Sequence, residues 1–323
     1  MPDSYAGSAM GHFNEQFNLI HENIELAVKG KREVIELLIL ALVCGGHVLI
    51  EDVPGVGKTT LGKALARSID VSFCRIQFTP DLLPVDITGT SVFDRATGTF
   101  EFRPGPVFSN IVLADEINRA SPKAQSALLE AMGEQQVTID GVTRHLESPF
   151  TVIATQNPLE DEGTYPLPES QLDRFLMRLE VGYPDRAAED SILVDRGARE
   201  PVDLIGPVAD ASVVRWMSDR LEDVHVSGPL RAYLLEVAGA TRRHPGLALG
   251  LSPRGVLAVL RVARARAASV NRDYVTPDDI KALAPAMLPH RLLPKPDSRV
   301  RGLRTSDIVT EIIDSVPVPR KGT

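Results

Sequence analysis

A glycine-rich loop in the first third of the sequence has the residues to bind phosphate. Positions 52–60 read DVPGVGKTT and follow the apolar run 47–51. Gly55 and Gly57 carry no side chain, so backbone N–H groups can converge there on phosphate oxygens. A helix expected at 59–68 would direct its positive end to the same place. The loop therefore predicts a site for the phosphates of a nucleotide.

The residues that close this loop would make the charged contacts. We expect Lys58 to pair with the β- and γ-phosphates and the Thr59 hydroxyl to ligate Mg²⁺. The usual GxxxxGK[ST] pattern begins with glycine, where this sequence has Asp52. Because that residue opens the loop and does not cradle phosphate, we expect it to be tolerated. The alternative interpretation is a glycine turn with a lysine at the surface.

Two carboxylates end a later apolar strand. Residues 110–116 read NIVLADE, an apolar run that finishes with Asp115 and Glu116. Ligands of open α/β sheets collect at the carboxyl ends of the strands, so both acids should face the phosphate loop. Asp115 would hold Mg²⁺ through water, and Glu116 would orient or deprotonate the attacking water. Two solvated acids are the alternative, but combined with the loop the pair favours hydrolysis over nucleotide binding alone.

Two residues farther along could reach the γ-phosphate. Asn157 follows the strand expected at 150–155 and could hydrogen-bond the phosphate or the attacking water, although Asn-Pro also starts turns. Arg174 could neutralise transition-state charge in the site of a neighbouring subunit. The alternative for Arg174 is a surface ion pair with Asp173 or Glu169, which contributes little to stability.

Arg254 falls in the first turn of a helix that Ser252 would cap. A cation is unfavourable at the positive end of a helix, unless an anion also binds there. The alternative is an arginine whose aliphatic stem covers apolar surface.

The composition is that of a globular protein with a substantial core. The 323 residues are 43% hydrophobic and 24% charged, with a net charge of −8. These values exclude a disordered, collagenous or coiled-coil chain, and the acidity argues against a general nucleic-acid coat. Cys44 and Cys74 are too few for a disulfide framework or a cysteine-rich zinc site, and both are expected to be structural. We find no signal peptide and no apolar run near the about 20 residues of a membrane span, so we expect a cytoplasmic protein.

The pattern of elements changes near Pro184. Before it, strands are expected at 47–51, 73–78, 111–114, 150–155 and 177–181, helices at 13–28, 32–43, 59–68 and 122–132, and hairpins at 91–102 and 136–146, while residues 1–11 should be loose. After it, only helices are expected, at 185–197, 212–222, 229–241, 254–270 and 277–286. The net charge changes from −11 before the boundary to +3 after it. We predict an α/β domain with a parallel sheet and helices on both faces at 1–183, and an all-α lid domain at 184–323.

Several ordered segments together resemble the AAA+ ATPases, and more closely the MoxR family. They read VPGVGKTT, QFTPDLLPVDITGT, FEFRPGPVF, VLADEINRASPKAQSALLEAMGEQQVTI and ATQNPLEDEGTYPLPESQLDRF, and the similarity extends over residues 22–293. The resemblance implies these nucleotide contacts: Val28, Gly30, Gly55, Val56, Gly57, Lys58, Thr59, Thr60 and Asp115. It also implies that Glu116 completes Walker B, that Asn157 is sensor 1, that Arg174 is the arginine finger and that Arg254 is sensor 2.

The same resemblance also implies an assembly and a cellular role. By analogy with the MoxR family, we expect a ring, usually a hexamer, with ATP and Mg²⁺ at the subunit interfaces. Arg254 would connect the bound ATP to the lid. The family also suggests chaperone-like remodelling or maturation of client proteins, with a von Willebrand factor A-domain protein as a possible partner. Segments 91–102 and 136–146 would correspond to the helix-2 insert and the hairpin before sensor 1.

Other functions remain open at this point. A magnesium-chelatase-like subunit or a nucleic-acid motor would share the insert, but Arg95 and Arg103 are balanced there by Asp94 and Glu101. The insert is therefore not a basic strip, and we do not expect nucleic acid as a partner. A nucleotide switch without hydrolysis is a further alternative, against which the presence of Glu116 counts.

Overall fold

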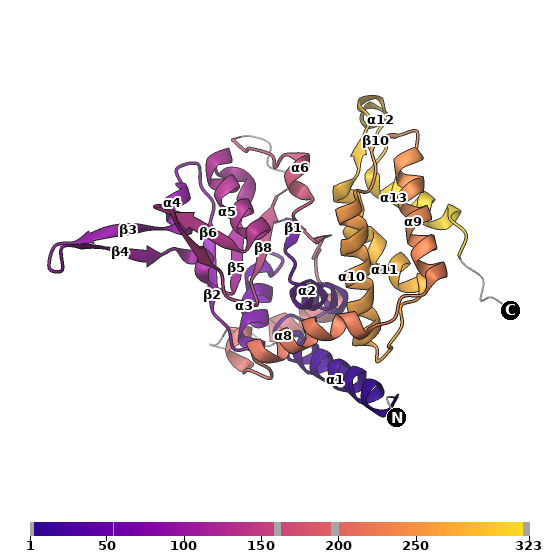
Figure 1. Ribbon diagram of the computed structural model, residues 1–323, viewed down its shortest axis with the longest axis horizontal. Coiled ribbons are helices and arrows are strands. Elements are labelled where there is room, and N and C mark those ends of the chain that lie inside the picture. Colours follow the sequence, from indigo (N-terminus) through magenta and orange to yellow (C-terminus); the bar gives the residue numbers. More distant parts are fainter. Residues whose placement is uncertain (1–2, 54, 158–162, 195–199, 319–323) are drawn as a thin grey trace. The chain divides into compact units, whose positions relative to one another are not determined.

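The computed structural model describes residues 3–53, 55–157, 163–194 and 200–318 (Figure 1). The chain divides into two compact units. The first, here called the α/β unit, holds Leu19–Phe175 and Leu179–Arg215. The second, here called the helical unit, holds the rest of the chain.

The α/β unit is built on one five-stranded sheet with the order β2-β5-β8-β1-β9. Its strands are β1 (Val48–Glu51), β2 (Phe73–Gln77), β5 (Ile111–Asp115), β8 (Thr151–Gln156) and β9 (Met177–Leu179), and of β9 only Leu179 is grouped with the α/β unit. The pairs β1–β8, β5–β8 and β2–β5 are parallel. Strands β1, β5 and β8 are almost wholly buried, as expected for parallel strands covered on both faces.

Helices cover both faces of this sheet, which confirms the predicted fold class. Alternate strand residues such as Val112 and Val152 share a buried cluster with Leu128 of α5 (Pro122–Glu134). On the other face, Gly62 of α3 (Lys58–Ser68) lies so close to Ile153 and Phe73 that a methyl group there would contact both side chains. The unit also holds α2 (Arg32–Val43), α4 (Pro84–Thr88), α6 (Glu169–Leu172), α7 (Arg186–Val194), the first part of α8 (Ala211–Arg220) and the second part of α1 (Asp3–Ala27).

Two β-hairpins leave the sheet layer. The predicted insert is β3 (Gly89–Asp94) paired with β4 (Thr99–Pro104), which Figure 1 shows as a long projection. The second hairpin is β6 (Gln136–Ile139) paired with β7 (Val142–His145). Its turn residues Asp140 and Gly141 both have positive φ, 52° and 76°, as a type I′ turn requires.

The boundaries between the two compact units differ from the domain boundary that we predicted near Pro184. The segment Leu179–Arg215 belongs to the α/β unit. Val208 and Ala209 donate backbone hydrogen bonds to the carbonyl oxygen of Ser68, at the end of α3. These contacts tie the segment to the α/β unit, and sequence periodicity gave no sign of them.

The first residues also differ from expectation. Residues 1–11 were expected to be loose; residues 1 and 2 lie outside the described part of the chain, and α1 spans Asp3–Ala27. Its first part belongs to the helical unit, where the Asn14 side-chain amide donates to the carbonyl oxygen of Ser269 at 2.5 Å. A capping contact with a distant helix end is invisible in local sequence, which explains the error.

The helical unit is not purely helical. Its helices are α9 (Gly228–Arg243), α10 (Pro253–Ser269), α11 (Pro277–Met287), α12 (Pro296–Val300) and α13 (Thr305–Ser315). The short strands β10 (Leu247–Leu249) and β11 (Leu293–Pro294) form an antiparallel pair that the sequence did not predict. Both strands have fewer than four residues, too short for a periodic signal. Among the described residues, no helix is long and apolar enough to cross a membrane.

A buried ion pair fixes the start of α11. Asp279 is 2% exposed and accepts two hydrogen bonds from the Arg272 guanidinium, at 2.6 and 2.9 Å, and two more from Thr276. The hydrogen bonds from Asp279 raise the pKa of Arg272 above its ordinary value. Removing one partner of such a pair leaves an uncompensated charge.

Asp279→Ala is therefore expected to lower the free energy of unfolding by about 3 kcal/mol, measured by urea denaturation. The exposed neighbour Asp278 is the matched control, and Asp278→Ala should cost about 0.5 kcal/mol. Equal losses for the two variants would contradict the assigned role of the buried pair.

Candidate active site

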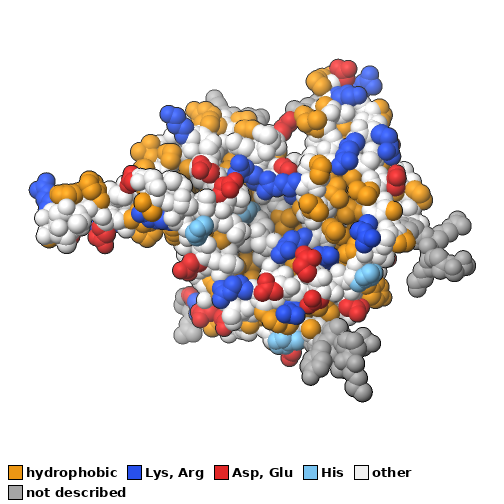
Figure 2. Space-filling view, in the orientation of Figure 1, with side chains coloured by type: hydrophobic (Ala, Val, Ile, Leu, Met, Phe, Trp, Pro, Cys, Tyr) orange, Lys and Arg blue, Asp and Glu red, His pale blue; other side chains and the backbone are white. Residues whose placement is uncertain are grey.

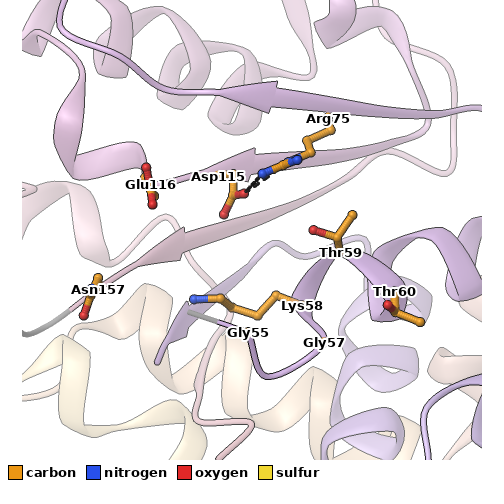
Figure 3. A pocket seen from close by; sticks show the side chains of 9 residues that line it. All are labelled: Gly55, Gly57, Lys58, Thr59, Thr60, Arg75, Asp115, Glu116 and Asn157. Carbon is orange, nitrogen blue, oxygen red and sulfur yellow. Dashed lines mark hydrogen bonds and ion pairs between the residues drawn. The ribbon is translucent and has the colours of Figure 1, made fainter. Parts of the chain in front are cut away.

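Eight of the predicted site residues of the α/β unit line one pocket. A cavity of about 260 Å³ is lined by Gly55, Gly57, Lys58, Thr59, Thr60, Arg75, Asp115, Glu116 and Asn157 (Figure 3). The loop after β1 and the ends of β5 and β8 reach it because these strands are parallel. Their carboxyl ends therefore meet at one edge of the sheet.

The loop between β1 and α3 has the backbone of a phosphate cradle. Gly55 and Gly57 have φ of 87° and 89°, a backbone conformation that residues with a side chain rarely adopt. A Cβ at either position would meet nothing within 4 Å, so the backbone conformation, and not crowding, requires glycine there. Gly57 immediately precedes α3 and makes no side-chain cap, which leaves the first N–H groups of the helix able to bind an anion.

Lys58 and Asp52 are held by the loop backbone itself. The Lys58 ammonium donates to the carbonyl oxygen of Asp52 at 3.0 Å. The carboxylate of Asp52 accepts from the backbone N–H groups of Val53, at 2.8 Å, and Gly182, at 2.5 Å. Asp52 is buried and does not line the pocket. The residue that replaces the first glycine of the pattern thus tethers the loop to the segment after β9.

Both carboxylate oxygens of Asp115 accept hydrogen bonds. Its Oδ1 accepts a 2.6 Å hydrogen bond from the Thr155 hydroxyl, which is fully buried on β8. Its Oδ2 accepts from Arg75 of β2, at 3.1 Å from Nε and 2.5 Å from Nη2 (Figure 3). The Asp115 side chain is 14% exposed and that of Arg75 is 48% exposed.

Glu116 has an unusual backbone and two polar partners. Its φ of 56° is left-handed, and its N–H donates to the Thr155 hydroxyl at 2.9 Å. Its Oε2 accepts from Gln77 Nε2 at 2.8 Å and from Arg119 at 3.0 Å. Left-handed backbone in a non-glycine residue is costly and occurs preferentially at functional sites. The two acids therefore point to different partners although they are adjacent in the chain.

Sequence reasoning missed Arg75, Gln77 and Thr155. Arg75 and Gln77 are two apart on β2, so both lie on one face of the strand, next to β5. The available signal was an arginine and a glutamine within an otherwise apolar stretch, FCRIQF. Thr155 gave no signal, because a threonine in a strand is ordinary.

Arg174 lies outside the pocket lining. It follows α6, and its guanidinium donates to the carbonyl oxygen of Leu129 in α5. The space it occupies is open because Gly133, one turn further along α5, has no side chain. The role of arginine finger stays a prediction.

The other predicted contacts also stay predictions. Arg254 is exposed in the first turn of α10, and Ser252 caps that helix as predicted, accepting from Gly255 N–H at 3.0 Å. Val28 and Val56 are buried, and Gly30 has a positive φ of 69°. None of these four predicted site residues, Arg254, Val28, Val56 and Gly30, is among those that line the pocket.

The donor set suits a cation that arrives with phosphate. Thr59 and Asp115 line the same pocket. Within the described part of the chain, no group of three or more His, Cys, Asp or Glu side chains could hold a metal ion. Mg²⁺ needs only one or two protein oxygen ligands when substrate phosphates and water supply the others, so these residues fit it.

Comparison with known proteins defines the class. Residues 47–177 match the ATPase family associated with various cellular activities (AAA), and residues 239–312 match the AAA lid domain. The solved structure of a presumed ATPase from Cytophaga hutchinsonii superposes with a TM-score of 0.89 at 37% identity, covering 98% of each chain. The chain thus has the fold of an AAA+ ATPase.

Two relatives specify the family. The chain is 39% identical to the chaperone MoxR1 of Mycobacterium tuberculosis, over 92% of this chain and 81% of that one. It is 50% identical to the protein YeaC of Bacillus subtilis, named as uncharacterized, over 92% and 93% of the two chains. The chain belongs to the MoxR family of AAA+ ATPases, as its sequence motifs predicted.

Proposed function

We propose that this ATPase requires Mg²⁺ and uses hydrolysis to remodel or mature client proteins, working as an oligomeric ring. The observation that carries the proposal is the single pocket that gathers Lys58, Thr59, Asp115, Glu116 and Asn157. These residues supply a cation for phosphate, two oxygen ligands, an acid and an amide, which is the set that phosphoryl transfer to water needs.

Each side chain has a defined task in this mechanism. Lys58 leaves the carbonyl oxygen of Asp52 and pairs with the β- and γ-phosphates. Thr59 and Asp115 would hold Mg²⁺, which neutralises charge on the phosphate oxygens when bound. Glu116 accepts a proton from the attacking water, and Asn157 orients that water or the γ-phosphate.

The projecting hairpin offers a surface for a client. Phe93 of β3 and Phe100 of β4 are 50% and 73% exposed and pack edge-to-face across the strands. Figure 2 shows hydrophobic side chains along this projection, with basic and acidic groups near them. Exposed aromatic groups favour a protein partner, because a nucleic-acid site would need a predominantly basic surface. Salt-dependent binding of nucleic acid would favour the motor instead.

The proposal is tested by measuring phosphate release and assembly on the same samples. Turnover should require Mg²⁺ and should rise with protein concentration as the subunits assemble, followed by light scattering. Full turnover by a demonstrably monomeric sample would contradict the ring. Absence of phosphate release in every assembly state would favour the nucleotide switch.

Arg174→Ala is expected to keep nucleotide binding and to lower turnover about a thousandfold, because an arginine finger contributes about 10³–10⁵ to the rate. Phosphate release by the assembled variant, beside binding of a fluorescent ATP analogue, checks this. Mixing Arg174→Ala with Glu116→Gln subunits should restore part of the activity, since each lacks a different half of a shared site. No restoration in mixed assemblies would speak against donation by a neighbouring subunit.

A further inference from the structure

We propose that Arg75 stands in for the metal at Asp115 when nucleotide is absent and so keeps a divalent cation from binding there alone. This inference rests on the proposed function, which assigns the metal to Asp115. Arg75 is then a positioning residue. It holds the Asp115 carboxylate in place and releases it when a cation enters together with phosphates.

The first argument is the geometry of the grip. Both Nε and Nη2 of Arg75 donate to Asp115 Oδ2, at 3.1 and 2.5 Å, and Thr155 occupies Oδ1 at 2.6 Å. Arg75 fills both acceptor positions of Oδ2 and Thr155 fills one of those on Oδ1, so a cation, or the water that carries it, competes with the guanidinium for this acid. Arg75 lines the same pocket as Thr59 and Asp115, the two residues expected to hold the metal, and Figure 3 shows its guanidinium pointing to Asp115.

The second argument is electrostatic. A positive charge in contact with Asp115 neutralises the acid, and it repels a second cation at about the same place. Free Mg²⁺ also gives up its water reluctantly and binds poorly to one or two carboxylates. The phosphates of a nucleotide add negative charge that outweighs the repulsion between Arg75 and the cation. Metal binding at Asp115 therefore depends on nucleotide.

The third argument is the connection from Arg75 to the second acid. Nη2 of Arg75 also donates to Oε1 of Gln77 at 2.8 Å, which turns the NH₂ group of that amide toward Glu116. A hydrogen-bonded chain thus joins Asp115 to Glu116 through the two β2 side chains. Release of Arg75 from Asp115 would therefore also change the hydrogen bond that Gln77 donates to Glu116.

The experiment titrates Mn²⁺, observed by electron paramagnetic resonance, into the full chain without nucleotide. Arg75→Gln should bind Mn²⁺ about tenfold more tightly than the parent, because a unit charge about 4 Å away has been removed. Arg75→Lys keeps the charge and should keep the weak parental affinity. The double variant Arg75→Gln with Asp115→Asn should lose the gain, which assigns the added binding to that acid.

The matched control removes a charge elsewhere on the same unit. Arg95 is exposed in the turn of the β3–β4 hairpin, and Arg95→Gln should leave Mn²⁺ affinity within about twofold of the parent. Thermal unfolding of each variant confirms that it is folded, and Arg75→Met serves as a second charge-free variant should the glutamine variant not fold.

Two outcomes separate this inference from the proposed function. Should the charge-free variants show no gain in nucleotide-free Mn²⁺ affinity, while Asp115→Asn weakens Mn²⁺ binding with a non-hydrolysable ATP analogue, the role of Arg75 is overturned and the metal site stands. Should Asp115→Asn leave Mn²⁺ binding with the analogue unchanged, the assignment of the metal to Asp115 fails, and with it this inference.

Discussion

Glu116→Gln is expected to bind ATP as well as the parent and to release phosphate at least about a hundredfold more slowly. General acid–base groups contribute about 10²–10⁴ to a rate, and glutamine cannot take a proton from water. The substitution keeps a side-chain oxygen that can accept from Gln77 and Arg119, so the position of the side chain should be conserved. Loss of activity with binding intact is then attributable to the proton acceptor.

Two measurements on one sample check this expectation: single-turnover phosphate release and equilibrium binding of a fluorescent ATP analogue. Glu130 is exposed on α5 and is the matched control, and Glu130→Gln should keep the parental rate. Hydrolysis by Glu116→Gln at the parental rate would show that another group activates the water.

Lys58→Ala is expected to weaken ATP binding at least about a hundredfold, which corresponds to about 3 kcal/mol for lost hydrogen bonds between charged groups. In the structure its ammonium is held at 3.0 Å by the carbonyl oxygen of Asp52, so it is already at the loop that would receive phosphate. Alanine favours helix, and α3 should therefore form in the variant.

Isothermal titration with ATP and Mg²⁺ measures the effect of Lys58→Ala. Lys63 on the same helix is the matched control, because it pairs with Glu200 at 3.1 Å and does not line the nucleotide pocket. Comparable loss of ATP affinity in Lys63→Ala would mean that overall charge, and not the contact at Lys58, controls binding.

Much of the site was readable before the fold was known. Lys58 and Asn157 follow buried strands, Asp115 ends one, and parallel strands bring their carboxyl ends to one edge of a sheet. Spacing and strand polarity together therefore gather these residues without knowledge of the strand order. The capping serine Ser121 and the Asp140–Gly141 turn were likewise predictable, because they act through their nearest neighbours.

The partners of these residues needed the fold. Arg75 reaches Asp115 only because β2 is the neighbour of β5, a pairing across about forty residues that no local pattern encodes. Asp52 was judged a tolerable departure, but its carboxylate is a tether that accepts from Gly182 N–H. The compact unit likewise extends past Pro184 through contacts with the end of α3.

The amino-acid order was sufficient to assign the family, the α/β class and most residues that line the pocket, because those features follow from local periodicity, turn chemistry and motifs of fixed spacing. The order was not sufficient to show that both acids are held by a polar chain from β2, or where each compact unit begins and ends. Those features come from contacts between residues distant in the chain, whose geometry exists only once the sheet has assembled.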